Sequence, residues 1–183
     1  MKVCIFGAGA VGGHAAARMI ASNAAEVSIV ARGAQLEAIR THGITLRTEG
    51  GEITGHPVAA VDNSDSLPLQ DIVIVTLKAP AQPAVADQIA RLLTPAGSAL
   101  FAMNGIPWWW RTGRADEGHL ECVDPGGFLW RSIGPQRALG AVINSSNQVV
   151  KPGVIVHSGA KRWTIGDPRN PDSERAARVV AII

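Results

Sequence analysis

Short apolar runs alternate with segments of helical spacing along the first hundred residues. The apolar runs are rich in β-branched residues and leucine, which is typical of strands buried on both faces of a sheet. Strands are expected at residues 3–6, 26–30, 71–77 and 98–103. Helices are expected from residue 10, over residues 34–42, and around Pro83 with a stop at residues 94–97. This alternation predicts a doubly wound (Rossmann-like) α/β fold with a mostly parallel sheet.

The pattern is weaker in the remaining segments. Residues 44–47 and 58–61 resemble two strands around a turn at residues 49–52. Residues 108–137 mix Trp, Gly, Pro and charged residues, which predicts irregular structure with a short helical piece near residues 128–132. Further strands are expected at residues 138–143, 153–157 and 162–165, with a turn at residues 151–153.

The last residues predict a helix that is apolar along one side. Asp172 and Ser173 are suitable N-caps, and an apolar stripe follows at Ala176, Val179, Val180 and Ile183. A helix this short gains its stability from packing against another element. We therefore expect residues 1–170 to form one domain, and residues 171–183 to begin the first helix of a second, helical domain in the natural protein.

Composition places the chain among ordinary globular proteins. It has 183 residues, a formal net charge of +2 and no block of like charges, which argues against binding to nucleic acid or to a membrane surface. The apolar run at the N-terminus breaks at Gly7 and continues with His14 and Arg18, unlike a secretory signal. Cys4 and Cys122 lack the spacing of a metal or redox site. These features favour a cytoplasmic protein without a bound metal.

Three glycines follow the first expected strand in the segment GAGAVG, residues 7–12. In a strand–turn–helix unit Gly7 permits a tight turn, Gly9 lets the backbone approach a diphosphate, and Gly12 lets the helix pack closely on the strand. The free N–H groups and the positive dipole at the start of the helix favour the same anion. The alternative is a glycine-rich turn with a purely structural role. The residues expected at this dinucleotide site are Gly7, Ala8, Gly9, Ala10, Val11 and Gly12.

The residue after the second expected strand bears on the choice of dinucleotide. NAD sites usually place an Asp or Glu at this position to hold the ribose 2′-hydroxyl. This chain has Arg32 there and no carboxylate. A guanidinium suits a 2′-phosphate through charge-assisted hydrogen bonds, so NADP(H) is favoured over NAD(H). The alternative is a solvated surface arginine.

Two more polar residues are expected at the same edge of the sheet. Lys78 follows the strand at 71–77 and Asn104 follows the strand at 98–103, where ligands of such folds bind. An asparagine offers a donor and an acceptor to a carboxamide or a substrate hydroxyl, but Asn-Gly is also a common turn dipeptide. The tryptophans at residues 108–110 suit three roles: lining the substrate side, covering a core, or forming a subunit contact.

Together these residues resemble the ketopantoate reductase (2-dehydropantoate 2-reductase) family. The similarity is carried by GAGAVG at residues 7–12, Arg32, VTLKA at residues 75–79 and NGIP at residues 104–107. Residues 140–159 are similar to the segment that closes the family's cofactor domain. The similarity runs in order from Met1 to about residue 170, so it depends on several motifs rather than on the glycines alone.

The resemblance implies that residues 7–12 and Arg32 bind NADPH, with Lys78 near the cofactor. It also implies that Asn104 contacts the nicotinamide end and the substrate, and that Ser146 provides a backbone contact to the cofactor. The implied reaction is hydride transfer from NADPH to a small 2-keto acid, with a lysine as general acid. The family places that lysine in a helical domain beyond residue 183. No catalytic residue is therefore expected in this chain, which alone would be inactive.

Two other functions suit the same residues. One is a non-catalytic NADP(H)-binding module used for sensing or scaffolding. The other is a different two-domain dehydrogenase acting on hydroxy acids or sugar acids, against which Arg32, Lys78 and Asn104 argue. A homodimer is compatible with the resemblance.

Overall fold

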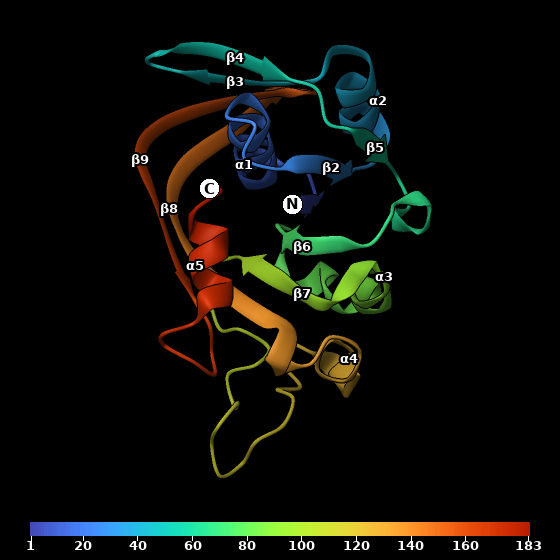
Figure 1. Cartoon of the computed structure of the whole chain (residues 1–183), viewed down its shortest axis with the longest axis vertical. Helices are drawn as coiled ribbons and strands as arrows, with labels where there is room; N and C mark the ends of the chain where they lie inside the picture. The colour runs from blue at the N-terminus through green and yellow to red at the C-terminus, as the bar shows by residue number, and fades with distance from the viewer.

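Nine strands form one sheet in the computed structural model, which describes all 183 residues (Figure 1). The strand order is β4-β3-β9-β8-β7-β6-β1-β2-β5. The strands are β1 (Lys2–Phe6), β2 (Glu26–Val30), β3 (Ile44–Thr48), β4 (Gly51–Gly55), β5 (Ala59–Val61), β6 (Gln70–Val75), β7 (Leu93–Ala102), β8 (Ala138–Lys151) and β9 (Val154–Gly166). The α-helices are α1 (Ala10–Ala21), α2 (Gly33–His42), α3 (Ala86–Leu92), α4 (Phe128–Ser132) and α5 (Glu174–Val180). The six strands from β8 to β5 in this order are parallel, which confirms the expected doubly wound fold.

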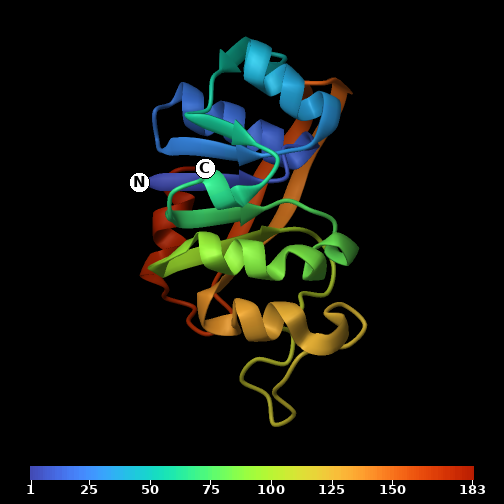
Figure 2. The ribbon, with the colours of Figure 1, turned by 90° about the vertical axis from the view of Figure 1, so that its right-hand side faces the viewer.

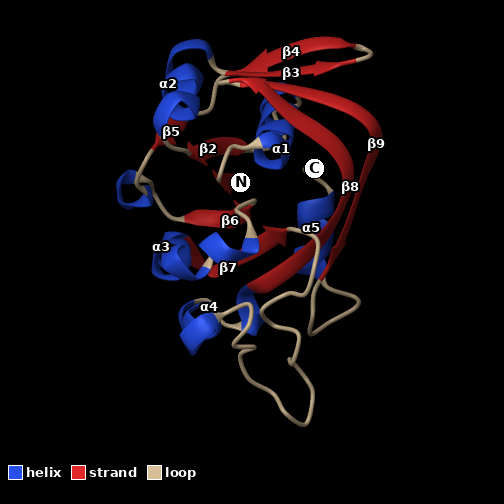
Figure 3. Cartoon of the chain, turned by 180° about the vertical axis from the view of Figure 1, so that it is seen from behind, coloured by secondary structure: helices blue, strands red, loops and turns tan.

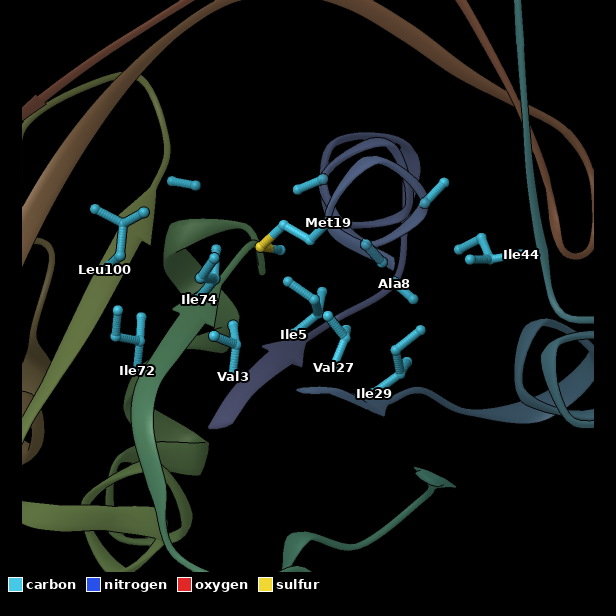
Figure 4. Close-up of a cluster of buried hydrophobic side chains, with 14 of the residues drawn as sticks. Val3, Ile5, Ala8, Met19, Val27, Ile29, Ile44, Ile72, Ile74 and Leu100 are labelled. Atoms are coloured by element: carbon cyan, nitrogen blue, oxygen red, sulfur yellow. The ribbon is translucent and has the colours of Figure 1, made fainter. Parts of the chain in front are cut away.

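The central strands are apolar because both of their faces are buried. In β1, Val3 and Ile5 belong to a cluster of 23 buried residues beneath α1, which we call the inner cluster (Figure 4). Cys4 and Phe6 point to the opposite face, into a cluster of 17 residues that we call the outer cluster. Burial raises the pKa of the Cys4 thiol to about 12, so this cysteine is a neutral core residue.

The helices cover both faces of the sheet, and the connecting helices change from one face to the other between β1 and β6. Helices α1, α2 and α5 contribute to the inner cluster, whereas α3 and α4 contribute to the outer cluster and lie beside each other (Figure 2). The carboxyl ends of β1 and β6 therefore meet where the winding reverses, which is where ligands bind in such folds. The longest helix, α1, has 12 residues, and none has both the length and the hydrophobicity required to span a bilayer.

Strands β8 and β9 are long and curve around α1 and α5 (Figure 3). The sequence predicts three short strands in this region, but the structure has one antiparallel pair joined by a turn at residues 152–153. The prediction fails because much of residues 144–150 is polar or exposed, so the apolar pattern fades while the backbone ladder continues. A register shift after Ser145 interrupts the ladder, and bulges of this kind bend a strand.

The hairpin of β3 and β4 differs from a second prediction made from the sequence. The sequence predicts that residues 44–47 and 58–61 flank one turn, but β3 pairs with β4, and β5 lies beside β2 at the opposite edge. Four of the five residues of β4 are exposed, so this edge strand has no alternating pattern to detect.

The segment around Pro83 differs from the sequence prediction at both ends. It starts as a 3₁₀ turn, Pro83–Val85, and becomes α-helical only at Ala86. Leu93, expected inside the helix, already pairs with Gln70 of β6 as the first residue of β7, and residues 94–97 belong to that strand.

The tryptophan run supplies core residues at two of its three positions. Trp108 and Trp109 are 1% and 7% exposed and belong to the outer cluster. Their ring centroids lie 5.0 Å apart, and both rings contact Phe101 of β7. Trp110 is exposed, and the Arg114 guanidinium lies 4.8 Å from its ring centroid. The first two tryptophans therefore cover a core, one of the three roles considered.

His14 of α1 and His157 of β9 pack together between helix and strand. Their rings stack with centroids 4.8 Å apart, and both residues are buried. Burial lowers the pKa of His14 to about 4, and the charges of His157, Arg18 and Lys161 act in the same direction. Arg18 Nε also donates to His14 Nε2 at 3.0 Å, which requires an unprotonated nitrogen. A neutral His14 therefore packs α1 against β9.

Helix α5 packs on the inner cluster through Val179, which is fully buried. The Ser173 side chain accepts a hydrogen bond from the Ala176 N–H, as expected of an N-cap. The domain thus covers part of the apolar stripe, while Val180 is 58% exposed. The assignment of residues 171–183 to a second domain stays a prediction.

An ion pair between Asp167 and Arg175 fixes α5 to the end of β9. The Asp167 side chain is 2% exposed and accepts hydrogen bonds from the Arg169 N–H at 3.0 Å, the Ser173 hydroxyl at 2.8 Å and the Arg175 guanidinium. Burial by itself would raise the pKa of Asp167. The three donors outweigh burial and hold this pKa below its ordinary value.

This lowered pKa predicts a loss of stability in acid. Stability from Asp167 is fully present above the unfolded-state pKa of about 4 and is lost as the pH falls through the lower folded-state pKa. We expect Asp167→Asn to lower the free energy of unfolding at neutral pH by about 2 kcal/mol and to flatten its acid dependence. Urea denaturation at several pH values measures both effects. A variant with the wild-type pH profile would contradict this role of Asp167.

Candidate functional site

The turn after β1 gives the glycines of residues 7–12 different structural roles. Gly7 has a φ of +103°, and a Cβ there would lie 2.8 Å from Leu77 Cδ2. At Gly12, which is buried, a Cβ would overlap the carbonyl oxygen of Gly7 and the hydroxyl of Thr76. Gly7 is therefore needed for the turn, and Gly12 for the close packing of α1 on β1.

Gly9 is exposed and faces open space. A Cβ at this position would meet nothing within 4 Å, and its φ of −75° suits any residue. Gly9 is the N-cap of α1, where no side chain caps the backbone, and the first turn contains no acidic residue. The first turn of α1 carries unpaired N–H groups and the positive end of the helix dipole. Because Gly9 has no side chain, an anion can approach this backbone closely.

Two side chains whose contacts the sequence does not reveal hold this turn in place. The Thr76 hydroxyl, just after β6, donates to the Gly7 carbonyl. Gln35, in the first turns of α2, donates from Nε2 to the Ala8 carbonyl at 2.7 Å and accepts from the Gly153 N–H at 3.0 Å. A single threonine or glutamine leaves no pattern in a sequence, because its partners are set by the tertiary fold.

The turn opens into a cavity of about 570 Å³ at the carboxyl ends of β1 and β2, which we call the nucleotide cavity. Four of the predicted residues line it: Gly7, Ala8, Gly9 and Arg32. Gln35 lines the same cavity, and no Asp or Glu does. Ala10, Val11 and Gly12 lie in the first turn of α1 and do not line it. A larger cavity of about 870 Å³ beside α3 contains none of the predicted residues.

Arg32 supplies the positive charge of the nucleotide cavity. It follows β2 directly, is exposed, and makes no side-chain hydrogen bond or ion pair within the chain. A free guanidinium and the absence of a lining carboxylate suit a phosphate better than a ribose hydroxyl.

The predicted residues follow neighbouring parallel strands along one edge of the sheet. Arg32 follows β2, the glycine turn follows β1, Lys78 follows β6 and Asn104 follows β7. This row spans about 14 Å, since neighbouring strands lie about 4.8 Å apart. Ser146 lies in β8, the next strand, beside its register shift. Lys78, Asn104 and Ser146 are exposed and lie outside the nucleotide cavity, although they share its edge of the sheet.

Asn104 joins the end of β7 to β8. Its Nδ2 donates to the Ile143 carbonyl at 2.9 Å, and its Oδ1 accepts from the Ile143 N–H at 2.8 Å. These bonds hold the amide in one orientation and leave one N–H and one oxygen lone pair for another partner. Gly105 has a φ of +111°, so the dipeptide also forms a turn.

A doubly wound sheet with a glycine turn at the reversal of its winding defines the class of dinucleotide-binding α/β domains. Within this class, residues 3–170 match the family described as ketopantoate reductase PanE/ApbA. The chain belongs to this family, as the resemblance in its motifs predicts.

Individual relatives agree with this assignment. The chain is 44% identical over 178 residues to a 2-dehydropantoate 2-reductase of Mesorhizobium japonicum, and the match covers 96% of this chain and 54% of that protein. A crystal structure assigned to a ketopantoate reductase of Ralstonia solanacearum MolK2 has a TM-score of 0.90 and 39% identity, over 98% of this chain and 56% of that one. The chain therefore spans about half the length of these relatives.

A more distant structure shows the same fold with ligands bound. D-mandelate dehydrogenase in a ternary structure with NADH and anilino(oxo)acetate has a TM-score of 0.74 at 16% identity. This match covers all of the present chain and 54% of the dehydrogenase. At that identity the similarity concerns the fold alone.

Proposed function

We propose that this chain is the cofactor-binding part of a cytoplasmic, NADPH-dependent reductase acting on a small 2-keto acid of the 2-dehydropantoate type. The observation that carries this proposal is the row of residues along the sheet edge. Across the strands β2, β1, β6 and β7, the residues come in the order Arg32, the glycine turn, Lys78 and Asn104. This order matches the groups along NADPH, which are the 2′-phosphate, the diphosphate and the nicotinamide beside the substrate. The reductases among the relatives support the substrate class.

The residues present fit NADPH. The backbone at Gly9 leaves space for the diphosphate, and any Cβ would reduce this space. Gly9 stands at the start of α1, where no side chain caps the helix. Arg32 has no partner within the chain, and the cavity wall between them carries no negative side chain. An NAD site would instead be expected to hold a carboxylate near the end of β2.

Each residue has a distinct task in the proposed reduction. NADPH, when bound, supplies the hydride. The backbone at Gly9 and the start of α1 bind the diphosphate, while Arg32 binds the 2′-phosphate. The remaining amide N–H of Asn104 orients the nicotinamide end and the substrate, and the exposed ammonium of Lys78 adds positive charge beside the anionic cofactor. No residue of this chain is proposed as the proton donor.

A kinetic assay of the full-length protein tests this function. We expect it to oxidise NADPH in the presence of 2-dehydropantoate or a related 2-keto acid, with NADH a poorer donor. Loss of NADPH absorbance across a panel of 2-keto acids measures the activity. A full-length protein that binds NADPH but reduces none of them would contradict the reductase and favour a non-catalytic NADP(H)-binding module.

A further inference from the structure

We propose that Gln35 is a positioning residue that prepares the glycine turn for the cofactor and anchors the β8–β9 turn beside it; this role rests on the function proposed above. Gln35 is half-buried on α2 and lines the nucleotide cavity. Its amide has one donor group and one acceptor group, and each is bonded to a different backbone segment.

The donor side of Gln35 fixes a peptide plane at the start of α1. Nε2 of Gln35 donates to the Ala8 carbonyl at 2.7 Å. The peptide between Ala8 and Gly9 is trans, so its carbonyl and its N–H point in opposite directions. A fixed Ala8 carbonyl therefore also fixes the Gly9 N–H, at the N-cap where the diphosphate is proposed to bind. Gly9 otherwise has the conformational freedom of an exposed glycine.

The acceptor side of Gln35 holds the turn between β8 and β9. Oε1 of Gln35 accepts from the Gly153 N–H at 3.0 Å, while the Gly153 carbonyl accepts from the Thr45 N–H at 2.8 Å. Gly153 has a φ of +76° and packs closely on Ala38 of α2. Val149, near the same end of β8, lines the nucleotide cavity. Gln35 thus connects the glycine turn to the β8–β9 turn through a single side chain.

Preorganisation of this kind strengthens binding because the turn no longer has to be ordered when the ligand arrives. The effect should be confined to ligands that carry the diphosphate. Adenosine 2′-monophosphate has the phosphate proposed for Arg32 but no diphosphate, so it reports on the rest of the cavity. Comparison of the two ligands separates positioning of the turn from a general loosening of the fold.

The test compares Gln35→Met, which keeps the length of the side chain but removes its amide, with the wild-type 183-residue chain. Gln148→Met is the matched control, because Gln148 is exposed on β8, does not line the nucleotide cavity, and its side chain makes no hydrogen bond within the chain. We expect Gln35→Met to weaken NADPH binding about tenfold. Affinity for adenosine 2′-monophosphate should change less than about twofold in both variants.

Each other outcome overturns a defined part of the proposal. If Gln35→Met binds NADPH as tightly as the wild type, Gln35 has no positioning role. Equal losses for NADPH and adenosine 2′-monophosphate would assign Gln35 to the stability of the whole domain instead. A wild-type chain that binds no NADPH would overturn the proposed function together with this role.

Discussion

Gly9→Ala is expected to fold like the wild type and to bind NADPH at least about tenfold more weakly. The added Cβ meets no atom within 4 Å, and the backbone at Gly9 is already in a conformation that alanine adopts. We therefore expect the fold and its stability to stay the same. The same Cβ occupies the space through which the diphosphate would reach the start of α1.

Gly12→Ala is expected to produce the opposite result. Its Cβ would overlap the Gly7 carbonyl and the Thr76 hydroxyl, and would lie 3.0 Å from Ile5 Cγ2. The backbone of α1 or of the glycine turn must therefore shift to make room for the added methyl group. We expect a loss of about 3 kcal/mol in the free energy of unfolding and a Tm lower by about 10 °C.

Thermal unfolding and NADPH titration of both variants measure this contrast. Gly9→Ala serves as the folding control for Gly12→Ala, because the two substitutions are chemically identical and three residues apart. A Gly9→Ala variant with wild-type NADPH affinity would remove the turn from the binding site. An unchanged Tm for Gly12→Ala would show that α1 does not pack on β1 as the structure describes.

Much of the fold could be predicted because the parallel strands are buried on both faces. Such strands carry uninterrupted apolar residues, as residues 72–75 of β6 do, and this signal does not depend on their neighbours. The strand predicted at residues 26–30 has the bounds of β2, and the short helical piece predicted near residues 128–132 is α4. Strand β4 and the outer parts of β8 and β9 are exposed, so their backbone pairing leaves no hydrophobic pattern.

The candidate site, like the fold, could be predicted only in part from the sequence. Gly7, Gly9 and Gly12 are recognisable because a glycine reports a requirement of the local backbone. Arg32, Lys78 and Asn104 could be placed because parallel strands end at a common edge. The contacts of Thr76 with the Gly7 carbonyl and of Gln35 with the Ala8 carbonyl join segments 69 and 27 residues apart. Such contacts depend on three-dimensional packing, which a single sequence does not display.

Arg32→Ala is expected to weaken NADPH binding at least tenfold, about 1.4 kcal/mol, and to leave NADH binding nearly unchanged. Only NADPH carries the 2′-phosphate that the unpaired guanidinium would bind. Arg47→Ala is a suitable control, because Arg47 is exposed on β3, pairs with Glu52 of β4 and does not line the nucleotide cavity. Raising the salt concentration should reduce the difference between wild type and Arg32→Ala, since exposed charges are screened.

Paired dissociation constants for NADPH and NADH, measured on the wild-type chain and on Arg32→Ala under the same conditions, test most directly whether this sheet edge binds a phosphorylated dinucleotide. The structure predicts that the wild type prefers NADPH and that Arg32→Ala loses this preference while retaining NADH affinity. A wild-type chain that binds neither dinucleotide, or a variant that loses both equally, would contradict the account.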